Sequence, residues 1–433
     1  MPAGSLPVLK TAVMYGADAV YIGGEAFSLR ARARNFTLEE IKEALDFAHE
    51  RGVKVYITAN IFAHNEDLEA IRKYFKELSL LKPDGVLISD PGVFVLAKDI
   101  MPEIPLHIST QANNTNYETF NFWYGLGAKR IVCARELSLK EIAQIRENIP
   151  PDMEIEAFIH GAMCISYSGR CLLSAYMTGR SANSGECTHP CRWKYTLEEE
   201  TRPGQHMPVY ENERGTYIFN SKDLCMIDHI PEMTAAGIDS FKVEGRMKSA
   251  LYVASVCRTY RMAIDDYFYE QSLEENGTEK PEIARNSEEK VSQKSYITPK
   301  KYSERKDFYK EEISKCTYRE YTTGFFFGKP DQDSQIYDAN TYIKEWTYLG
   351  QISEDKKVSG GRVYYGLTQK NKFCVGEKVE IMKPSGENIE TEVLDMLNEE
   401  GEKIESCPHA QMHFYADFGC GLSPYDIIRR RTV

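Results

Sequence analysis

The sequence lacks the features that would assign it at once to a membrane or secreted class. It contains no run of about 18 apolar residues, which excludes a membrane-spanning helix. The segment Met1 to Ser5 includes neither a charged stretch nor a long apolar one, so we expect no signal peptide and a cytoplasmic protein. Positive charge is also scarce, because 53 Lys and Arg stand against 65 Asp and Glu. The net charge of −12 argues mildly against a generic nucleic-acid binder.

Three common catalytic motifs are missing as well. No His-Glu-x-x-His, no Gly-x-Ser-x-Gly and no glycine-rich P-loop occurs, so zinc-protease, serine-hydrolase and P-loop chemistry have no support. A cysteine nucleophile with a histidine partner stays open, for instance Cys164 with His160, although a ligand role explains Cys164 better. The length of 433 residues predicts two to three domains. The composition, 42% hydrophobic and 27% charged, is that of an ordinary globular protein.

Units of helix, turn and strand repeat through the first 270 residues. Each helical stretch ends in a small turn, usually with glycine, and a short β-branched strand follows. Near-continuous apolar strands are typical of a parallel sheet that is buried on both faces. Seven such strands are expected, at residues 19–24, 53–60, 86–90, 106–111, 130–135, 154–161 and 240–245.

An eighth strand would complete a TIM-like (β/α)8 barrel, the α/β fold that we predict, with a doubly wound open sheet as its competitor. The slot for that strand precedes Pro2, where the chain begins abruptly, so the first strand is expected to be missing. The barrel domain is predicted at residues 1–270, with a cysteine-rich insertion at 161–230. Residues 271–334 are predicted to be a charged linker or excursion, and residues 335–433 a small all-β barrel.

Polar residues follow the ends of the predicted strands. In a parallel barrel the carboxyl ends of the strands meet at one mouth, where active sites lie. Any one of these side chains could be a simple cap, but so many at one mouth favour a ligand site. The cations among them would suit an anionic substrate. The set is Asn60, Asp90, Gln111, Asn113, Arg135, His160, Lys242, Glu244 and Arg246.

The eleven cysteines are unevenly spread. Their odd number, in a long chain without a secretory signal, argues against a disulfide framework. Cys164, Cys171, Cys187 and Cys191 fall within one short segment, and Cys225 follows. Only Cys187-x3-Cys191 approaches a zinc knuckle, so the spacing favours an iron–sulfur cluster, with zinc and unligated thiols as alternatives. The segment from Cys164 to residue 194 carries four basic residues and one acidic residue, which suits a thiolate-ligated cluster or a phosphate.

One continuous stretch resembles a known family. Residues 156–174, Glu-Ala-Phe-Ile-His-Gly-Ala-Met-Cys-Ile-Ser-Tyr-Ser-Gly-Arg-Cys-Leu-Leu-Ser, look like the signature of the collagenase-like peptidases, peptidase family U32. The β-rich tail resembles the C-terminal domain of that family. Members of the family usually have a strand before Pro2, and its absence is the one clear departure. Further segments that resemble the family are residues 2–5, 27–33, 134–138 and 242–246.

The resemblance implies RNA modification more than proteolysis. The better-understood branches are similar to prephenate-dependent tRNA hydroxylases of the wobble uridine, to a ribosomal-RNA cytidine hydroxylase and to ubiquinone-biosynthesis hydroxylases. The last of these branches lacks a β-rich tail, so the tail favours the RNA-modifying branch. The resemblance also implies a [4Fe–4S] cluster, with Cys164, Cys171, Cys187 and Cys225 as ligands and Cys191 as an alternative ligand.

The function expected from this resemblance is the formation of 5-hydroxyuridine in the anticodon loop of tRNA, with prephenate as cosubstrate. Proteolysis, ribosomal-RNA cytidine hydroxylation and a non-enzymatic RNA-binding role are the alternatives. Cations at the mouth would hold the cosubstrate or RNA phosphate, amides would contact substrate, and titratable groups would transfer protons. The cations are Arg135, Lys242 and Arg246, the amides are Asn60, Gln111 and Asn113, and the titratable groups are His160, Asp90 and Glu244.

Overall fold

The computed structural model describes ten stretches of the chain. These are residues 1–24, 35–164, 166–168, 170–182, 186–193, 196–198, 206–208, 222–276, 299–329 and 342–432. The family-like segment at 27–33 and parts of the expected linker, at 277–298 and 330–334, lie outside the described residues. None of the helices within these stretches is long and apolar enough to cross a membrane.

The chain forms two compact units. The barrel unit comprises Met1–Val13, Asp18–Lys248 and Arg319–Tyr342, and the C-terminal unit comprises Met14–Ala17, Ser249–Tyr318 and Ile343–Val433. A long helix and a short one belong to the C-terminal unit together with its sheet. The segment predicted as a linker contains regular structure for the same reason.

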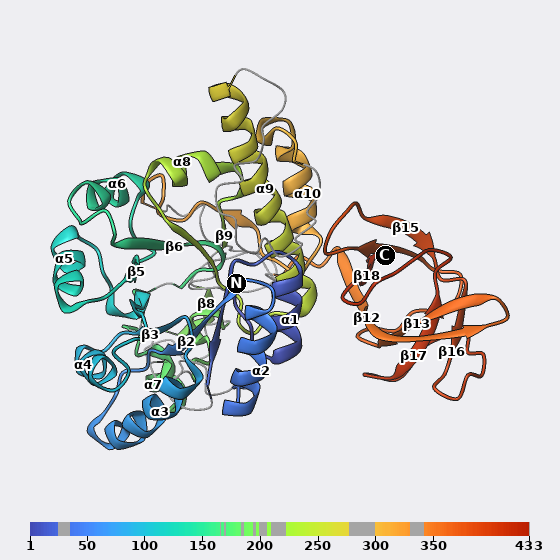
Figure 1. The fold of residues 1–433 in the computed structure, drawn as a ribbon, viewed down its shortest axis with the longest axis horizontal. Helices are drawn as coiled ribbons and strands as arrows, with labels where there is room; N and C mark the ends of the chain where they lie inside the picture. Colours follow the sequence, from blue (N-terminus) through green and yellow to red (C-terminus); the bar gives the residue numbers. More distant parts are fainter. Residues whose placement is uncertain are drawn as a thin grey trace. The chain divides into compact units, whose positions relative to one another are not determined.

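Seven parallel strands joined by helices form the barrel unit (Figure 1). They pair in the order β1-β2-β3-β4-β5-β6, and β10 pairs in parallel with β6. All seven coincide with predicted strands, and the TIM-like α/β architecture is confirmed. The strands are β1 (Ala19–Gly23), β2 (Lys54–Ala59), β3 (Gly85–Ile88), β4 (Leu106–Ile108), β5 (Arg130–Val132), β6 (Glu154–Ala162) and β10 (Ser240–Val243).

Helices connect these strands, and Figure 1 shows α2 to α6 on the outside of the strands. Local sequence sets their ends. At the start of α2, Glu40 N donates to Thr37 Oγ1 at 3.1 Å and Thr37 N donates to Glu40 Oε2, a reciprocal cap. Gly127 ends α5 with a left-handed φ of 98°. The helices are α1 (Leu6–Met14), α2 (Leu38–His49), α3 (Leu68–Leu81), α4 (Pro91–Ile100), α5 (Tyr117–Leu126), α6 (Leu139–Glu147), α7 (Leu173–Thr178) and α8 (Ile230–Ala235).

The first residues of the chain lie beside β1. Pro2 forms a parallel bridge with Tyr21 of β1. Around it, Tyr21 N donates to Met1 O at 2.9 Å, and Ala3 N donates to Tyr21 O at 3.1 Å. This is a single bridge, and among the described residues no strand of the sheet precedes β1, so the absence of a full first strand stays a prediction.

Additional strands pair with the end of β6 or form a separate ladder. β9 (Asp223–Cys225) pairs antiparallel with the end of β6, and β11 (Tyr321–Thr322) pairs in parallel with β9. A separate hairpin is formed by β7 (Thr196–Glu198) and β8 (His206–Pro208). These pairings were not predicted, since β9 and β11 are too short to show a periodic pattern.

The C-terminal unit joins two helices to an antiparallel sheet. The helices are α9 (Ala250–Asn276) and α10 (Lys306–Ser314). The sheet has the order β15-β14-β18-β12-β13-β17-β16 and curls around an apolar core that includes Leu349, Phe373 and Phe414. The prediction of a small all-β domain is confirmed as a curled half-barrel. Its strands are β12 (Trp346–Ser359), β13 (Arg362–Thr368), β14 (Lys378–Met382), β15 (Ile389–Glu392), β16 (Asp395–Leu397), β17 (His413–Asp417) and β18 (Ile427–Arg431).

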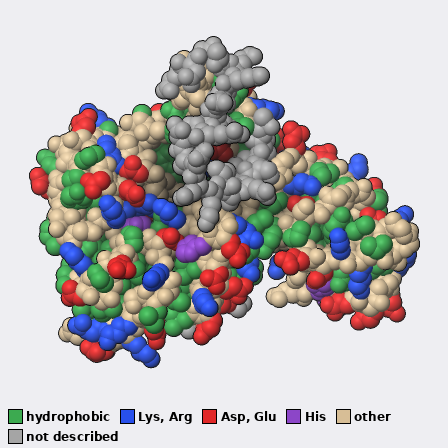
Figure 2. All heavy atoms as spheres, in the orientation of Figure 1, with side chains coloured by type: hydrophobic (Ala, Val, Ile, Leu, Met, Phe, Trp, Pro, Cys, Tyr) green, Lys and Arg blue, Asp and Glu red, His purple; other side chains and the backbone are tan. Residues whose placement is uncertain are grey.

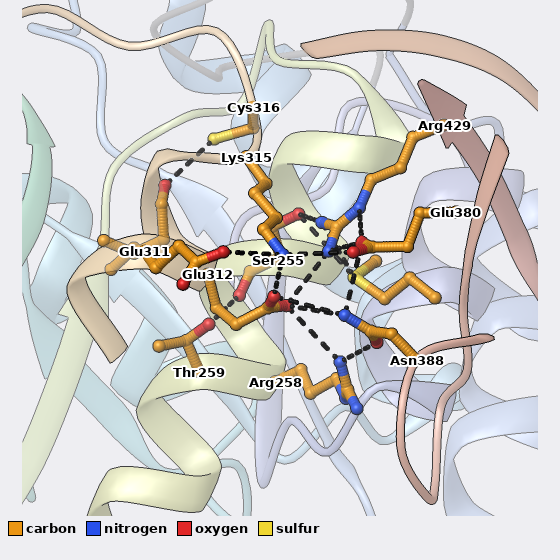
Figure 3. A network of polar contacts seen from close by, with 12 residues as sticks. Ser255, Arg258, Thr259, Glu311, Glu312, Lys315, Cys316, Glu380, Asn388 and Arg429 are labelled. Carbon is orange, nitrogen blue, oxygen red and sulfur yellow. Dashed lines mark hydrogen bonds and ion pairs between the residues drawn. The ribbon is translucent and has the colours of Figure 1, made fainter. Parts of the chain in front are cut away.

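A buried network of charges connects α9, α10, β14 and β18 within this unit (Figure 3). Arg429 lies 3.0 Å from Glu312 and donates to Glu380 at 2.7 Å. Lys315 lies 2.7 Å from Glu312 and 3.0 Å from Glu380, and Arg258 lies 3.6 Å from Glu312. Although burial alone raises the pKa of Glu312, the neighbouring Arg429 and Lys315 lower it to about 2. Glu312 therefore stays ionised, and its ion pairs with Arg429 and Lys315 hold the helices on the sheet.

Candidate active site

The ends of β2, β3 and β4 carry the first predicted mouth residues. Asn60 Nδ2 donates to Ser109 Oγ at 3.0 Å, and Ser89 Oγ donates to the backbone oxygen of Asn60 at 2.9 Å. The structure thus brings these three strand ends together. Asp90 caps α4, because Val93 N donates to its Oδ1 at 2.9 Å. A capping role explains the position of Asp90 without any part in proton transfer.

Gln111 and Asn113 form a bent connection after β4. Asn113 adopts a left-handed φ of 54°, and its Nδ2 donates to the backbone oxygens of Gln111 at 2.9 Å and Ser168 at 3.0 Å. The second bond attaches the cysteine-rich insertion to the mouth of the barrel. Among the described residues, Gln111 Oε1 and Asn113 Oδ1 are buried and accept no hydrogen bond. Two unpaired buried acceptors are costly unless a ligand satisfies them.

Arg135 and Glu244 form an ion pair across the mouth. Arg135 Nη2 lies 3.3 Å from Glu244 Oε2, and Nη1 donates to Ala162 O at 3.4 Å. The guanidinium also stacks over Phe158 at 4.0 Å from the ring centroid. The two charged side chains are only 14% and 16% exposed. Arg135 Nε is buried and has no partner in the described part of the chain, so this cation retains a donor for a ligand.

Lys242 lies inside the barrel and not at its rim. Its Nζ donates to Glu156 Oε1 at 2.5 Å, and Arg130 contacts the same carboxylate at 3.0 Å. Ser240 Oγ donates to Glu156 Oε2 at 2.8 Å. Although burial alone raises the pKa of Glu156, Lys242 and Arg130 lower it to about 2. The positive charge of Lys242 is therefore already balanced by a buried carboxylate.

The buried pair of Glu156 and Arg130 was missed from the sequence. Both lie in strands that read as buried on both faces, and a charge in such a strand is the signal that could have revealed them. No local sequence pattern identifies Lys242 as the partner of Glu156, because the two residues are 86 positions apart.

Arg246 crosses the end of β1. Its Nη2 donates to Gly23 O at 3.3 Å and to Asn35 Oδ1 at 2.5 Å, and the side chain is buried. A Cβ at Gly23 would lie 2.1 Å from Arg246 Nη2, so glycine is required for this approach. The three predicted cations therefore differ. Arg135 keeps an unpaired donor, whereas Lys242 and Arg246 are engaged with protein groups.

His160 is fully buried in β6. Its ring lies 5.5 Å from that of Tyr321, and in the sheet it stands opposite Cys225 of β9. Its backbone oxygen accepts from Glu244 N at 2.8 Å. Burial, reinforced by Lys248, lowers the pKa of His160 to about 3. The imidazole is thus neutral at neutral pH.

The five clustered cysteines are thiols, not disulfides, and they differ in exposure. Cys164 and Cys187 are exposed, whereas Cys171, Cys191 and Cys225 are partly buried. Within the described stretches, no three His, Cys, Asp or Glu side chains come together in a group that could hold a metal ion. Thiols are the donors that an iron–sulfur cluster requires, and the cluster itself stays a prediction.

Two protein-family models match most of the chain. The family model for peptidase family U32 matches residues 4–307, and that for the U32 C-terminal domain matches residues 344–429. The chain belongs to peptidase family U32. The two matches cover the barrel strands and the antiparallel sheet, so the family resemblance read from the sequence is confirmed.

Three relatives of this chain have names that refer to different substrates. The chain is 38% identical over 411 residues to "tRNA hydroxylation protein P1" of Bacillus subtilis (strain 168), which covers 94% of this chain and 88% of that protein. It is 38% identical to "23S rRNA 5-hydroxycytidine C2501 synthase" of Escherichia coli (strain K12), over 61% of this chain and 38% of that protein. It is 37% identical to "Collagenase" of Porphyromonas gingivalis (strain ATCC BAA-308 / W83), over 61% of this chain and 65% of that protein.

Proposed function

We propose that this U32 protein is a tRNA hydroxylase that forms 5-hydroxyuridine at the wobble position, with prephenate as cosubstrate. Two relatives with RNA hydroxylation in their names support the general reaction. The tRNA relative matches almost the whole chain, including the C-terminal sheet, whereas the ribosomal-RNA and collagenase relatives match 61% of it. This difference in coverage favours tRNA as the substrate.

The observation that carries the proposal is the pair of unpaired acceptors at the barrel mouth. Uracil offers one N–H donor on its pairing edge. Gln111 Oε1 and Asn113 Oδ1 are buried acceptors without a partner among the described residues, so either could receive that donor. Because both donor bonds of Asn113 Nδ2 are used by backbone oxygens, the orientation of its amide is set by its surroundings.

Arg135 is the residue that we assign to the anionic cosubstrate. Prephenate carries carboxylates, and a guanidinium binds a carboxylate through parallel hydrogen bonds. Arg135 has a buried Nε without a described partner and is held in place by Glu244 and the Phe158 ring. Lys242 and Arg246 contribute to the positive potential but keep their protein partners.

The [4Fe–4S] cluster is part of the proposal on the chemistry of the donors alone. Cys164, Cys171, Cys187 and Cys225 supply four thiols, and Cys191 supplies a fifth. When bound, such a cluster would supply redox or Lewis-acid chemistry near the substrate. Since the described cysteines are not gathered into a site, we assign no reaction step to it.

Proteolysis is supported by the family name and by one relative. A thiol peptidase would need Cys164 beside an imidazole that accepts its proton. His160 is buried and its pKa is lowered to about 3, which makes it a weak base, whereas Cys164 is exposed, so this pair is not favoured. Release of peptides from gelatin that is lost in C164A would support the peptidase.

The test is nucleoside mass spectrometry on RNA from a bacterial strain that lacks its own tRNA uridine hydroxylation. Expression of this protein should restore 5-hydroxyuridine derivatives in the tRNA fraction. In a strain that also cannot make prephenate, restoration should fail. Hydroxycytidine that appears in ribosomal RNA instead would favour the ribosomal-RNA alternative. No new hydroxylated nucleoside in either fraction would contradict the proposal.

A further inference from the structure

The cysteine-rich segment exposes an unusual number of large apolar side chains. Tyr176 is 87% exposed and Leu172 is 69% exposed. Single exposed apolar residues are ordinary, but a group of them on one short segment marks an interaction surface. We call this group the cysteine-loop surface. Its members are Tyr167, Leu172, Tyr176, Met177 and Trp193.

Hydrogen bonds organise the segment that carries this surface. Thr188 N donates to Ser174 Oγ at 3.1 Å, and the two hydroxyl groups lie 3.1 Å apart. These bonds connect α7 to the segment that follows Cys187, and α7 packs against the short helix η4 (Pro190–Arg192). Leu172 and Tyr176 are four residues apart, so they lie on one face of α7. Tyr176 is therefore presented by a folded element, and Trp193 directly follows η4.

The surface is attached to the barrel mouth. Asn113, which follows β4, donates to Ser168 O at 3.0 Å, one residue after Tyr167. Asn113 also carries one of the unpaired acceptors assigned above to the substrate base. The backbone next to Tyr167 is therefore bonded to a residue of the mouth.

The charge of the segment selects the partner. Arg170 and Arg180 are exposed, and the stretch from Cys164 to residue 194 contains four basic residues and one acidic residue, in a chain whose net charge is −12. A second copy of the chain would bring two such positive segments together, which is unfavourable. An anionic partner with flat apolar groups suits both properties. Single-stranded nucleic acid has these properties, since its bases stack on aromatic rings and its phosphates attract arginine.

We infer that the cysteine-loop surface stacks the unpaired bases of single-stranded RNA that flank the base held at the barrel mouth. This inference rests on the proposed function and adds to it the part of the protein that grips the RNA loop. Stacking would compensate the loss of base–base stacking when one nucleotide leaves the loop and enters the mouth.

The inference is tested with the full-length, anaerobically purified protein. Its Kd is measured for a labelled anticodon stem-loop RNA and for a fully paired RNA hairpin of equal length. Y176A and W193A should raise the Kd for the stem-loop about 5- to 150-fold, as loss of a stacked base predicts, and leave the weak hairpin binding unchanged. Y176F retains the ring and should bind as the original chain does. Phe122, an exposed aromatic on α5, provides the matched control F122A, which should also bind normally.

Salt dependence separates the arginines from the aromatics. Replacing Arg170 and Arg180 by Ala should lower the slope of log Kd against log salt by about 0.7 for each RNA phosphate that the two arginines neutralise. Y176A should leave that slope unchanged.

Two results would overturn the inference. One is normal stem-loop affinity in both Y176A and W193A. The other is a dimer of the original chain that Y176A converts to monomers, which would make the surface a self-association interface. Failure of the proposed function is distinguishable, because the original chain would then restore no hydroxylated nucleoside. If the original chain restores 5-hydroxyuridine and both variants bind and restore it equally well, only the inference fails.

Discussion

Glu156 shows how one buried carboxylate organises the interior of the barrel. It accepts from Lys242 and Ser240 and contacts Arg130, and its own side chain is almost completely buried. Removing one partner from a buried ion pair leaves an uncompensated charge in a medium that solvates it poorly. The residue therefore carries a prediction about stability that is independent of function.

E156Q should lower the free energy of unfolding by about 3–5 kcal/mol, measured by denaturant titration, because two buried cations lose their counter-charge. E154Q is the matched control. Glu154 also contacts Arg130, but its side chain is 46% exposed, so this variant should lose less than about 1 kcal/mol. Equal effects of the two variants would contradict the account.

The pH dependence of this contribution follows from the lowered pKa of Glu156. A depressed pKa in the folded state stabilises the protein above the ordinary glutamate value of 4.5. The contribution should fall as the pH drops from 4.5 toward about 2, where the native carboxylate takes up a proton. The loss of stability of the original chain in that interval should be steeper than that of E156Q. Parallel curves would be inconsistent with the prediction.

Gln111 carries the second residue-scale prediction. Q111L removes a buried acceptor that has no partner among the described residues, so the free energy of unfolding should stay within about 1 kcal/mol or rise. If the acceptor binds the substrate base, hydroxylation of tRNA should fall at least about tenfold. Full activity in Q111L would remove Gln111 from the site. Loss of activity with loss of folding would assign it a structural role.

At the scale of elements, strands were easier to foresee than their partners. Each barrel strand is a short apolar run after a turn, so its position follows from local sequence. The pairing of Cys225 with His160 joins segments 65 residues apart, and no local pattern encodes it. The same holds for Arg246, whose contacts with Gly23 and Asn35 join residues that are 223 and 211 positions apart in the sequence. Residues at strand ends could be listed from sequence, but their roles depended on these distant contacts.

The C-terminal unit depends on the charges that join its helices to its sheet. R429M replaces a fully buried guanidinium on β18 by an apolar side chain of similar length, and it leaves Glu312 and Glu380 facing one another with fewer cations. The free energy of unfolding of this unit should fall by about 3–5 kcal/mol. Thermal denaturation of the full chain measures the change. R431M, two residues further along β18 at an exposed position, should change the transition little. An unchanged thermal transition in R429M would show that the charge network is not needed for stability.

For the whole molecule, net charge is a poor guide to its partner. On the face shown in Figure 2, acidic and basic side chains are interspersed and form no single acidic surface. The cysteine-rich segment is locally basic although the chain carries −12. RNA binding is therefore compatible with an acidic protein if the contact is confined to the mouth and the cysteine-loop surface.

The proposed cluster gives a prediction about the protein as purified. After anaerobic purification, the chain should be brown and contain about four iron ions. Serine variants of Cys164, Cys171, Cys187 and Cys225 should each lose most of the iron, and C191S will show whether the fifth thiol substitutes. C374S, which changes a partly buried thiol in the C-terminal unit, is the control and should retain iron. A colourless, iron-free protein after reconstitution would refute the cluster.

The proposed function requires that the barrel mouth hydroxylates tRNA with Arg135 holding an anionic cosubstrate. The most direct measurement is the 5-hydroxyuridine content of tRNA from the complemented strain, compared between the original chain and R135A, with the thermal midpoint of both proteins measured in parallel. The proposed function predicts that the original chain restores the modified nucleoside and that R135A restores less than about a tenth of it. R135A should still unfold in one cooperative transition, at a lower thermal midpoint because the ion pair with Glu244 is lost. Equal restoration by both proteins, or none by the original chain, would contradict the proposed function.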